Sequence, residues 1–357
     1  QNAAMEGLVG QAAHLAFPGA SRAVANAVGT LVPAWGAFLE AHPEHFWAGL
    51  TALAAVLLLL SGGYRRLEKI TTILVVFVTF ITMVCVLGLP LTPYPVKLDE
   101  LAQGFTFSIP AAGVALAFSA FGITGVGASE LFAYPYWCIE KGYARAAGRR
   151  SPSDEWVRRA RGWMRVMRLD AWCSMVVYTL ATVAFYLLGA AVLHPQGIQP
   201  QGAEMLKQLS AMYQPALGDW TVSVFLVGAW AVLFKTLYVS TAANGRLFAD
   251  FLKLAGIWTT NTPRQRDHVV KAFCIISPAI AFGLYVLLRE PRFLVMIGGT
   301  AQALMLPLIA GATLYLRRRD ADPRVAPSLT SDVFCWLAAL AITIVAGYSL
   351  LEPLFKR

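Results

Sequence analysis

Charged side chains are scarce in this sequence. Only 14% of its 357 residues are Asp, Glu, Lys or Arg, whereas a soluble domain usually carries about 25%. Hydrophobic residues make up 57%, and the mean hydropathy is +0.59. Neither a disordered chain nor an ordinary soluble protein has this composition, so both classes are excluded.

The motifs of soluble catalysis are also missing. The sequence has no phosphate-binding Gly-x-x-x-x-Gly-Lys loop, no His-Glu-x-x-His zinc motif and no Gly-x-Ser-x-Gly turn. We therefore expect neither an enzyme nor a resident cofactor. The cysteines stand singly, without Cys-x-x-Cys spacing, and we interpret them as small core residues. They are Cys85, Cys138, Cys173, Cys274 and Cys335.

Long apolar runs, by contrast, are abundant. A helix needs about 20 mostly apolar residues to cross a bilayer, and eight segments approach or exceed that length. They are Phe46–Gly63, Ile70–Leu89, a broken pair within Ser108–Glu140, Ala171–Leu193, Trp220–Ala243, Val269–Leu288, Phe293–Leu316 and Val333–Leu351. We predict an all-α polytopic membrane protein whose residues 1–357 form one transmembrane domain.

Two shorter segments precede these spans. Val28–Leu39 contains Pro33 and is too short to cross, so we expect an interfacial or re-entrant piece. Met5–Phe17 is interpreted as the tail of a further membrane helix. The histidines are scattered over this first helix and the loops. His42 and His45 are close enough in sequence to meet, but we expect both to be solvated in an exterior connection.

Lysine and arginine alternate between rich and poor connections. The rich side has Arg65, Arg66 and Lys69, nine residues between Lys141 and Arg168, five between Arg246 and Lys271, and four between Arg317 and Arg324. The poor side has Lys97, Lys207, Arg289, Arg292, Lys356 and Arg357. The positive-inside rule places the rich loops in the cytoplasm. We expect a multi-pass protein of the plasma or inner membrane that contacts lipid and no nucleic acid.

The segment Ser108–Gly142 has the pattern of a broken helix. Gly122, Gly125 and Gly127 follow an apolar half-helix within six residues, and each glycine costs about 1 kcal/mol inside a helix. Transporters place such breaks at substrate sites near the bilayer midplane. Ser129 suits the N-cap of the second half and Glu130 its first turn. The alternative is that the glycines only mark a close helix–helix contact.

Few other polar residues lie inside the spans. Lys235 is either a structural ion-pair partner or a group linked to the substrate or to a proton. Gln302 follows Gly298 and Gly299, which suggests a kinked segment that faces a cavity. An interhelical hydrogen bond is the alternative role for Gln302. In the basic loop, Asp154–Arg168 is predicted to be an amphipathic interfacial helix with Trp156 and Trp163 at the headgroup level.

The order of these features resembles the Nramp family of divalent-metal transporters, which have the leucine-transporter-type fold. The correspondence covers Phe46 to Leu351, beginning with a link that resembles the family's junction between helices four and five. That link is GGYRRLEK, Gly62–Lys69; LFKTLYVSTAANGRLFADFL resembles helix eight, and GGTAQALMLPL resembles helix ten. The broken helix resembles helix six. The resemblance implies an inverted-repeat bundle and places Gln302 near the ion.

The chain departs from the family in two places. At the Met-Pro-His signature of helix six it has Gly127, Ala128 and Ser129, so no thioether is available and hard oxygen ligands would favour magnesium, calcium or manganese. The first two helices, with their Asp-Pro-Gly-Asn motif, have no counterpart. We therefore expect an N-terminally truncated sequence in which residues 1–45 are a remnant of helix three and its connection, and residues 46–351 are helices four to eleven.

The leading hypothesis is a secondary transporter that moves divalent cations by alternating access. The resemblance implies that Gly125, Gly127, Ser129, Glu130 and Gln302 face the ion. The metal ion is the transported substrate, and coupling to a proton, with Lys235 as a candidate group, is left open. One alternative is transport of an amino acid or another organic solute. Another is a membrane sensor or partner subunit that transports nothing.

Overall fold

The computed structural model describes residues 1–61, 64–104, 113–201, 204–258 and 262–355. The chain is 85% helical, and the described ranges contain no strand, as the composition predicts. Within those ranges, eight helices are long and apolar enough to cross a membrane. Each overlaps one of the eight predicted segments, so the prediction of a polytopic all-α membrane protein is confirmed.

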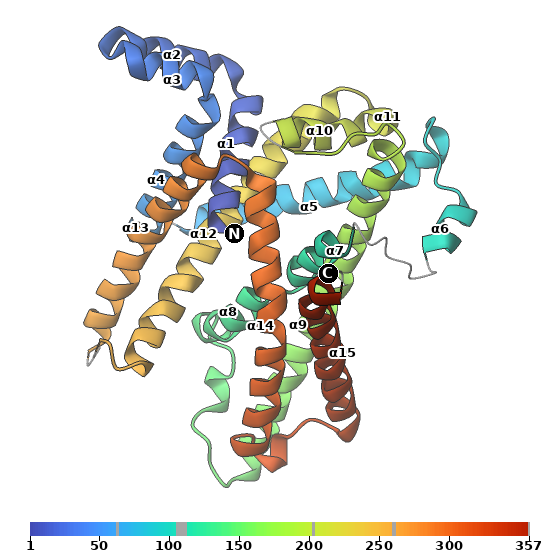
Figure 1. Cartoon of the computed structure of the whole chain (residues 1–357). Helices are drawn as coiled ribbons and strands as arrows, with labels where there is room; N and C mark the ends of the chain where they lie inside the picture. Colours follow the sequence, from blue (N-terminus) through green and yellow to red (C-terminus); the bar gives the residue numbers. More distant parts are fainter. Residues whose placement is uncertain (62–63, 105–112, 202–203, 259–261, 356–357) are drawn as a thin grey trace. The chain divides into compact units, whose positions relative to one another are not determined.

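The chain divides into two compact units, Gln1–Thr106 with Val183–Val295, and Phe107–Thr182 with Met296–Arg357. The first holds α1 (Asn2–Ala16), α2 (Pro18–Leu31), α3 (Pro33–Ala41), α4 (Pro43–Ser61), α5 (Tyr64–Gly88), α6 (Leu98–Gly104), α10 (Met205–Ser210), α11 (Gln214–Leu217), α12 (Trp220–Leu254) and α13 (Pro263–Leu288). The second holds α7 (Val114–Ile123), α8 (Ala128–Glu140) and α15 (Leu329–Phe355), and α9 (Asp154–Leu188) and α14 (Pro291–Arg319) contribute to both (Figure 1).

Prolines set the start of many helices. α2, α3, α4, α13 and α14 each begin at a proline, which suits the first helical position because its fixed φ is already helical and its missing N–H would be unpaired there anyway. At α13 the signal is completed by a capping box, in which Thr262 and Gln265 satisfy each other's backbone N–H groups. These boundaries are therefore local properties of the sequence.

The first unit is built around α1, which packs against α4, α12 and α13 (Figure 1). Small residues make this possible, because a side chain at Gly10 would collide with α4 and one at Gly7 would collide with Tyr285 of α13. Glu6 and Gln11 are buried with the helix. The expectation that Met5–Phe17 is helical is confirmed. Its 15 residues are fewer than a full crossing needs.

Two short helices cover the segment that was predicted to be interfacial or re-entrant. α2 and α3 pack against each other, with Gly29 and Gly36 in direct backbone contact. The chain leaves the helical conformation at Val32, before Pro33, because a residue that precedes proline disfavours helical angles. Val28–Leu39 is therefore not one segment, since the turn between two helices divides it.

Cysteines and histidines agree only in part with their predicted environments. Cys85 and Cys274 are buried and all five cysteines are free, as expected, but Cys173 is exposed. His45 lies in the first turn of α4 with only 4% of its surface exposed. The prediction that His45 is solvated is therefore wrong, because aromatic rings of Phe38 and Tyr285 cover it.

The predicted interfacial helix is the first part of a longer element. Asp154–Arg168 is helical, but it continues without interruption into the span as α9. Trp156 is 9% exposed, with the guanidinium of Arg324 lying 5.3 Å from its ring centroid. Trp163 packs on Tyr143, with 5.6 Å between ring centroids. Trp156 therefore packs against protein, and its predicted depth at the headgroup level stays a prediction.

A buried aspartate holds the same region together. Asp322 accepts hydrogen bonds from Arg150 Nε at 2.9 Å and from Arg324 Nη2 at 2.8 Å. Arg324 also donates to the carbonyl oxygens of Ser151 and Pro152 at 3.0 and 2.9 Å. The hydrogen bonds from Arg324 hold the pKa of the Asp322 carboxyl well below its usual range. Asp322 therefore stays ionised at neutral pH and ties two connections to the start of α9.

Replacing Asp322 with Asn should lower the apparent melting temperature of the protein in detergent, because Arg150 and Arg324 lose their shared counterion. The matched control is Asp320→Asn, since Asp320 is exposed and lies 4.0 Å from Arg319. A depressed pKa stabilises the fold above the unfolded-state value of about 3.9. The difference between wild type and Asp322→Asn should thus be constant from pH 6 to pH 8 and disappear only in strong acid. Equal melting temperatures for the two variants at pH 7 would contradict this role.

Candidate functional site

The second unit contains the helical break that the glycines predict. α7 ends at Ile123 and α8 begins at Ala128. Thr124 is extended, with φ −79° and ψ 130°, and Gly125 has φ +82°, a conformation that only glycine adopts without strain. The part of the predicted half-helix before residue 113 lies outside the described residues.

The start of α8 differs from the prediction in one respect. Gly127, rather than Ser129, is the N-cap residue, and it supplies no side-chain hydrogen bond. Ser129 lies inside the first turn, where its own backbone N–H needs an acceptor. Glu130 is in the first turn as predicted. The N-terminus of α8 therefore depends on a partner from another helix.

Gln302 of α14 is that partner. Its Oε1 accepts from the Ser129 backbone N–H at 3.1 Å and lies 3.0 Å from Ser129 Oγ. The same hydroxyl is 3.0 Å from Glu130 Oε2, and its single proton can be donated to only one of these oxygens at a time. Gln302 is 7% exposed, while Glu130 is exposed. Three side-chain oxygens from α8 and α14 thus lie together at a helix N-terminus.

Gly127 leaves room for these oxygens. A Cβ atom added to Gly127 would lie less than 3.0 Å from both Gln302 Oε1 and Glu130 Oε2. Both are the ends of flexible side chains and could move, but Gln302 would then lose its hydrogen bonds to Ser129. The space beside Gly127 is therefore filled by two oxygens, and a side chain there would displace them.

Gly122 has a different role from the other two glycines. It lies within α7 and is buried, and a Cβ there would collide with the Gly299 carbonyl oxygen and the Ala303 nitrogen of α14. Ser119 Oγ donates to the Met296 carbonyl oxygen at 2.9 Å in the same contact. The helix-contact interpretation thus holds for Gly122. Of the three glycines, Gly125 and Gly127 lie in the unwound segment between Ile123 and Ala128.

Tyr178 of α9 also lies beside the break. Its ring would be 3.2 Å from a Cβ on Gly125, so the ring lies directly against the unwound backbone. The sequence gives no sign of this contact, because Tyr178 is one of several aromatic residues in an apolar span. In α14, Gly298 and Gly299 do not end the helix, which runs from Pro291 to Arg319, and the predicted kink stays a prediction.

Lys235 belongs to the first unit. It lies on α12, and its Nζ donates to Thr72 Oγ1 of α5 at 2.9 Å. This contact joins two helices of that unit and is what a structural lysine would make. It does not test a role in coupling, which stays a prediction.

The donor set defines what the break can bind. Hydroxyl, carboxylate and carboxamide oxygens are hard ligands of the kind that Mg²⁺, Ca²⁺ and Mn²⁺ take in proteins. A carboxylate beside the positive end of a helix is favourably placed, and the Glu130 side chain offers its oxygens to a cation there. None of these residues offers sulfur or imidazole. The cluster is thus suited to a hard divalent cation.

The profile of the family described as "natural resistance-associated macrophage protein-like" (Nramp) matches residues 8–352. The match covers nearly the whole chain, including both halves of the break and all of α14. No curated protein sequence matches the chain.

Replacing Gly127 with Ala should lower the apparent melting temperature by a few degrees. The new Cβ displaces Gln302, and loss of its hydrogen bond to the partly buried Ser129 N–H costs about 1 kcal/mol. Gly311→Ala is the control, since Gly311 lies in the same α14 helix with open space around it, and alanine is the better helix former. Thermal unfolding in detergent should therefore show a loss for the first variant and no loss for the second. Identical behaviour would contradict the close packing at Gly127.

Proposed function

Because the chain belongs to the Nramp family, a family of divalent-metal transporters, we propose that it carries divalent cations across a membrane by alternating access around the break between α7 and α8. The finding that supports this most is the cluster of oxygens from Ser129, Glu130 and Gln302. The backbone carbonyl oxygen of Gly125 lies in the unwound segment and adds a further ligand, whereas that of Gly127 can contribute only beside the hydrogen bond that it accepts from the Leu131 N–H at 3.2 Å. Freed carbonyls of this kind coordinate ions in secondary transporters.

The proposed ion preference follows from the ligand atoms. An all-oxygen set lacks the soft donor that favours cadmium or iron over magnesium. Two oxygens lie where a methionine side chain would project from position 127. Magnesium and manganese should therefore compete on nearly equal terms.

A cation fits this site better than an organic anion. Helix N-termini bind carboxylates through free backbone N–H groups, but here Gln302 already accepts from the Ser129 N–H. The Glu130 carboxylate lies next to the same place and would repel a second anion. An amino-acid substrate would have to displace both groups.

The proposal includes an orientation. The Lys-rich and Arg-rich loops face the cytoplasm, as the positive-inside rule requires, and the protein lies in the plasma or inner membrane. The proposal does not assign proton coupling to a residue. The hydrogen bond from Lys235 to Thr72 favours a structural role for this lysine.

Transport by proteoliposomes that contain the full-length gene product tests the site. Glu130→Gln should reduce manganese uptake at least about tenfold, equivalent to about 1.4 kcal/mol, because it removes a full charge beside the ion. Gln302→Ala should reduce uptake less, since it removes a neutral oxygen. Asp320→Asn, an exposed carboxylate in a connection, is the control and should transport normally.

The metal panel separates the alternatives. Magnesium should inhibit manganese uptake about as well as unlabelled manganese does. If Glu130→Gln transports normally and cadmium outcompetes magnesium in the wild type, the oxygen site is wrong and Glu130 is only a helix cap. Amino-acid flux without metal flux would favour the organic-solute alternative, and no flux of either kind would favour a sensor or partner subunit.

A further inference from the structure

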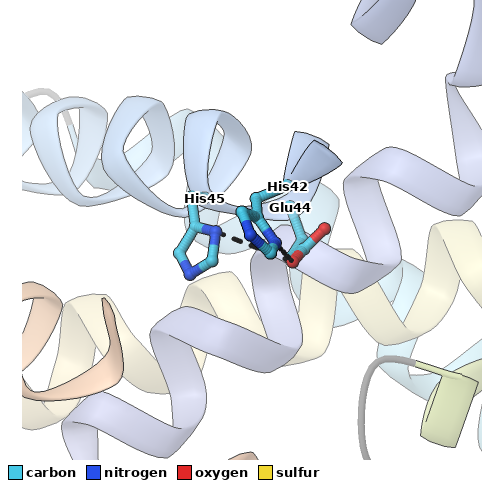
Figure 2. Close-up of side chains that lie close together, drawn as sticks. All are labelled: His42, Glu44 and His45. Carbon is cyan, nitrogen blue, oxygen red and sulfur yellow. Dashed lines mark ion pairs between the residues drawn. The ribbon is translucent and has the colours of Figure 1, made fainter. Parts of the chain in front are cut away.

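A second cluster of metal-ligating side chains lies at the junction of α3 and α4 in the first unit. His42 follows the last residue of α3, Pro43 begins α4, and Glu44 and His45 lie in the first turn of α4. Because the proline fixes the start of the helix, all three side chains leave the backbone within one turn. Figure 2 shows both imidazole rings beside the Glu44 carboxylate.

The three ligand atoms are spaced as if around one ion. Nδ1 of His42 is 3.7 Å from Glu44 Oε1, and Nδ1 of His45 is 3.6 Å from the same oxygen. These distances are too long for hydrogen bonds. Ligands of a tetrahedral zinc ion at bond lengths of 2.0–2.1 Å lie about 3.3 Å apart. All three atoms lie within 4.8 Å of one another, so the two distances to Glu44 would have to shorten by about 0.4 Å or less, and the remaining distance by at most about 1.5 Å, to reach the spacing around zinc.

The buried histidine gives an independent indication of a ligand. His45 is 4% exposed, and neither of its ring nitrogens has a hydrogen-bond partner. Burying a polar group without a partner costs about 1–3 kcal/mol. Phe38 and Tyr285 stack around the ring, with ring centroids 5.8 and 5.2 Å from that of His45, and they offer no acceptor on its faces. A bound cation would satisfy the nitrogen that points at Glu44.

We propose that His42, Glu44 and His45 bind a divalent transition-metal ion of the zinc class. Two imidazoles and one carboxylate are the ligand set of open zinc sites, which complete their coordination with water. The His42 side chain is 31% exposed and that of Glu44 15%, so an ion and its water can reach the cluster from that side. The carboxylate beside the positive end of α4 adds to the attraction for a cation.

This site goes beyond the proposed transport function. It lies in the first unit, uses nitrogen ligands, and shares no residue with the oxygen cluster of Ser129, Glu130 and Gln302. Since His42 caps α3 and the other two ligands belong to α4, a bound ion joins the two helices. Binding to the folded state then stabilises the protein according to the metal concentration.

Arg289 provides a test that a merely structural cluster would not pass. Its Nη1 lies 3.5 Å from His42 Nε2, so its positive charge opposes a cation on the other side of the ring. Replacing Arg289 with Gln removes that repulsion, and Zn²⁺ affinity should rise about threefold or more.

The main experiment measures Zn²⁺ binding to the purified full-length gene product in detergent, by competition with a fluorescent chelator. His42→Ala and Glu44→Gln should each lower the Zn²⁺ affinity of this cluster at least about tenfold, because each removes a ligand. His194→Ala is the matched control, because His194 is an exposed histidine in a connection. Zn²⁺ should raise the melting temperature of the wild type and of His194→Ala but not that of His42→Ala.

The outcomes distinguish this site from the transport site. Glu130→Gln should retain the zinc-class site, and X-ray absorption of its Zn²⁺ complex should show imidazole scattering. The proposal is overturned if His42→Ala and Glu44→Gln bind Zn²⁺ as tightly as the wild type, or if the bound zinc has only oxygen neighbours. His42→Ala and Glu44→Gln alter partly exposed side chains, so the test does not depend on a variant of buried His45.

Discussion

The hydrogen bonds between Gln302 and Ser129 are the interaction on which the second unit depends. A helix that starts within a membrane has unpaired N–H groups, and no water in the hydrocarbon core can satisfy them. Gly127 has no side chain with which to cap α8. Gln302 supplies the missing acceptor from α14, and the same oxygen becomes part of the candidate cation site.

The close contact of α7 with α14 makes that interaction possible. Gly122 and Gly299 have no side chains at the crossing, so the two backbones meet directly. Three residues beyond Gly299, the chain reaches Gln302, whose carboxamide extends to the start of α8. The glycines that bring the two helices together therefore also bring the oxygens of Gln302, Ser129 and Glu130 together.

Local sequence patterns predicted the parts of this structure that depend on nearby residues. The apolar runs gave the eight spans, and the positive φ of Gly125 matches a break predicted from glycine spacing. Contacts between residues distant in sequence were not predictable in this way. Serine is a common N-cap residue, but Ser129 lies inside the first turn of α8. There its N–H and hydroxyl contact Gln302 Oε1, 173 positions away in the sequence.

The same limit explains why the environments of Trp156 and His45 were not predicted. Trp156 has the spacing of a membrane anchor, but Arg324 covers it. His45 follows a polar stretch that suggests a solvated loop, but Tyr285 of α13 packs over its ring. In each case the sequence identified the residue, and a partner distant in sequence decided its environment.

The absence of a side chain at Gly127 also constrains how this chain could evolve. A methionine at that position would displace the oxygens of Gln302 and Glu130, so a thioether cannot be gained there while the two oxygens keep their places. A mutational path between the two arrangements would have to pass through an intermediate with a poor version of both. Under the proposed transport function, selection for metal uptake would remove such intermediates. The glycine and the two oxygen residues should therefore be inherited as a group, and a lineage that has the group should seldom leave it.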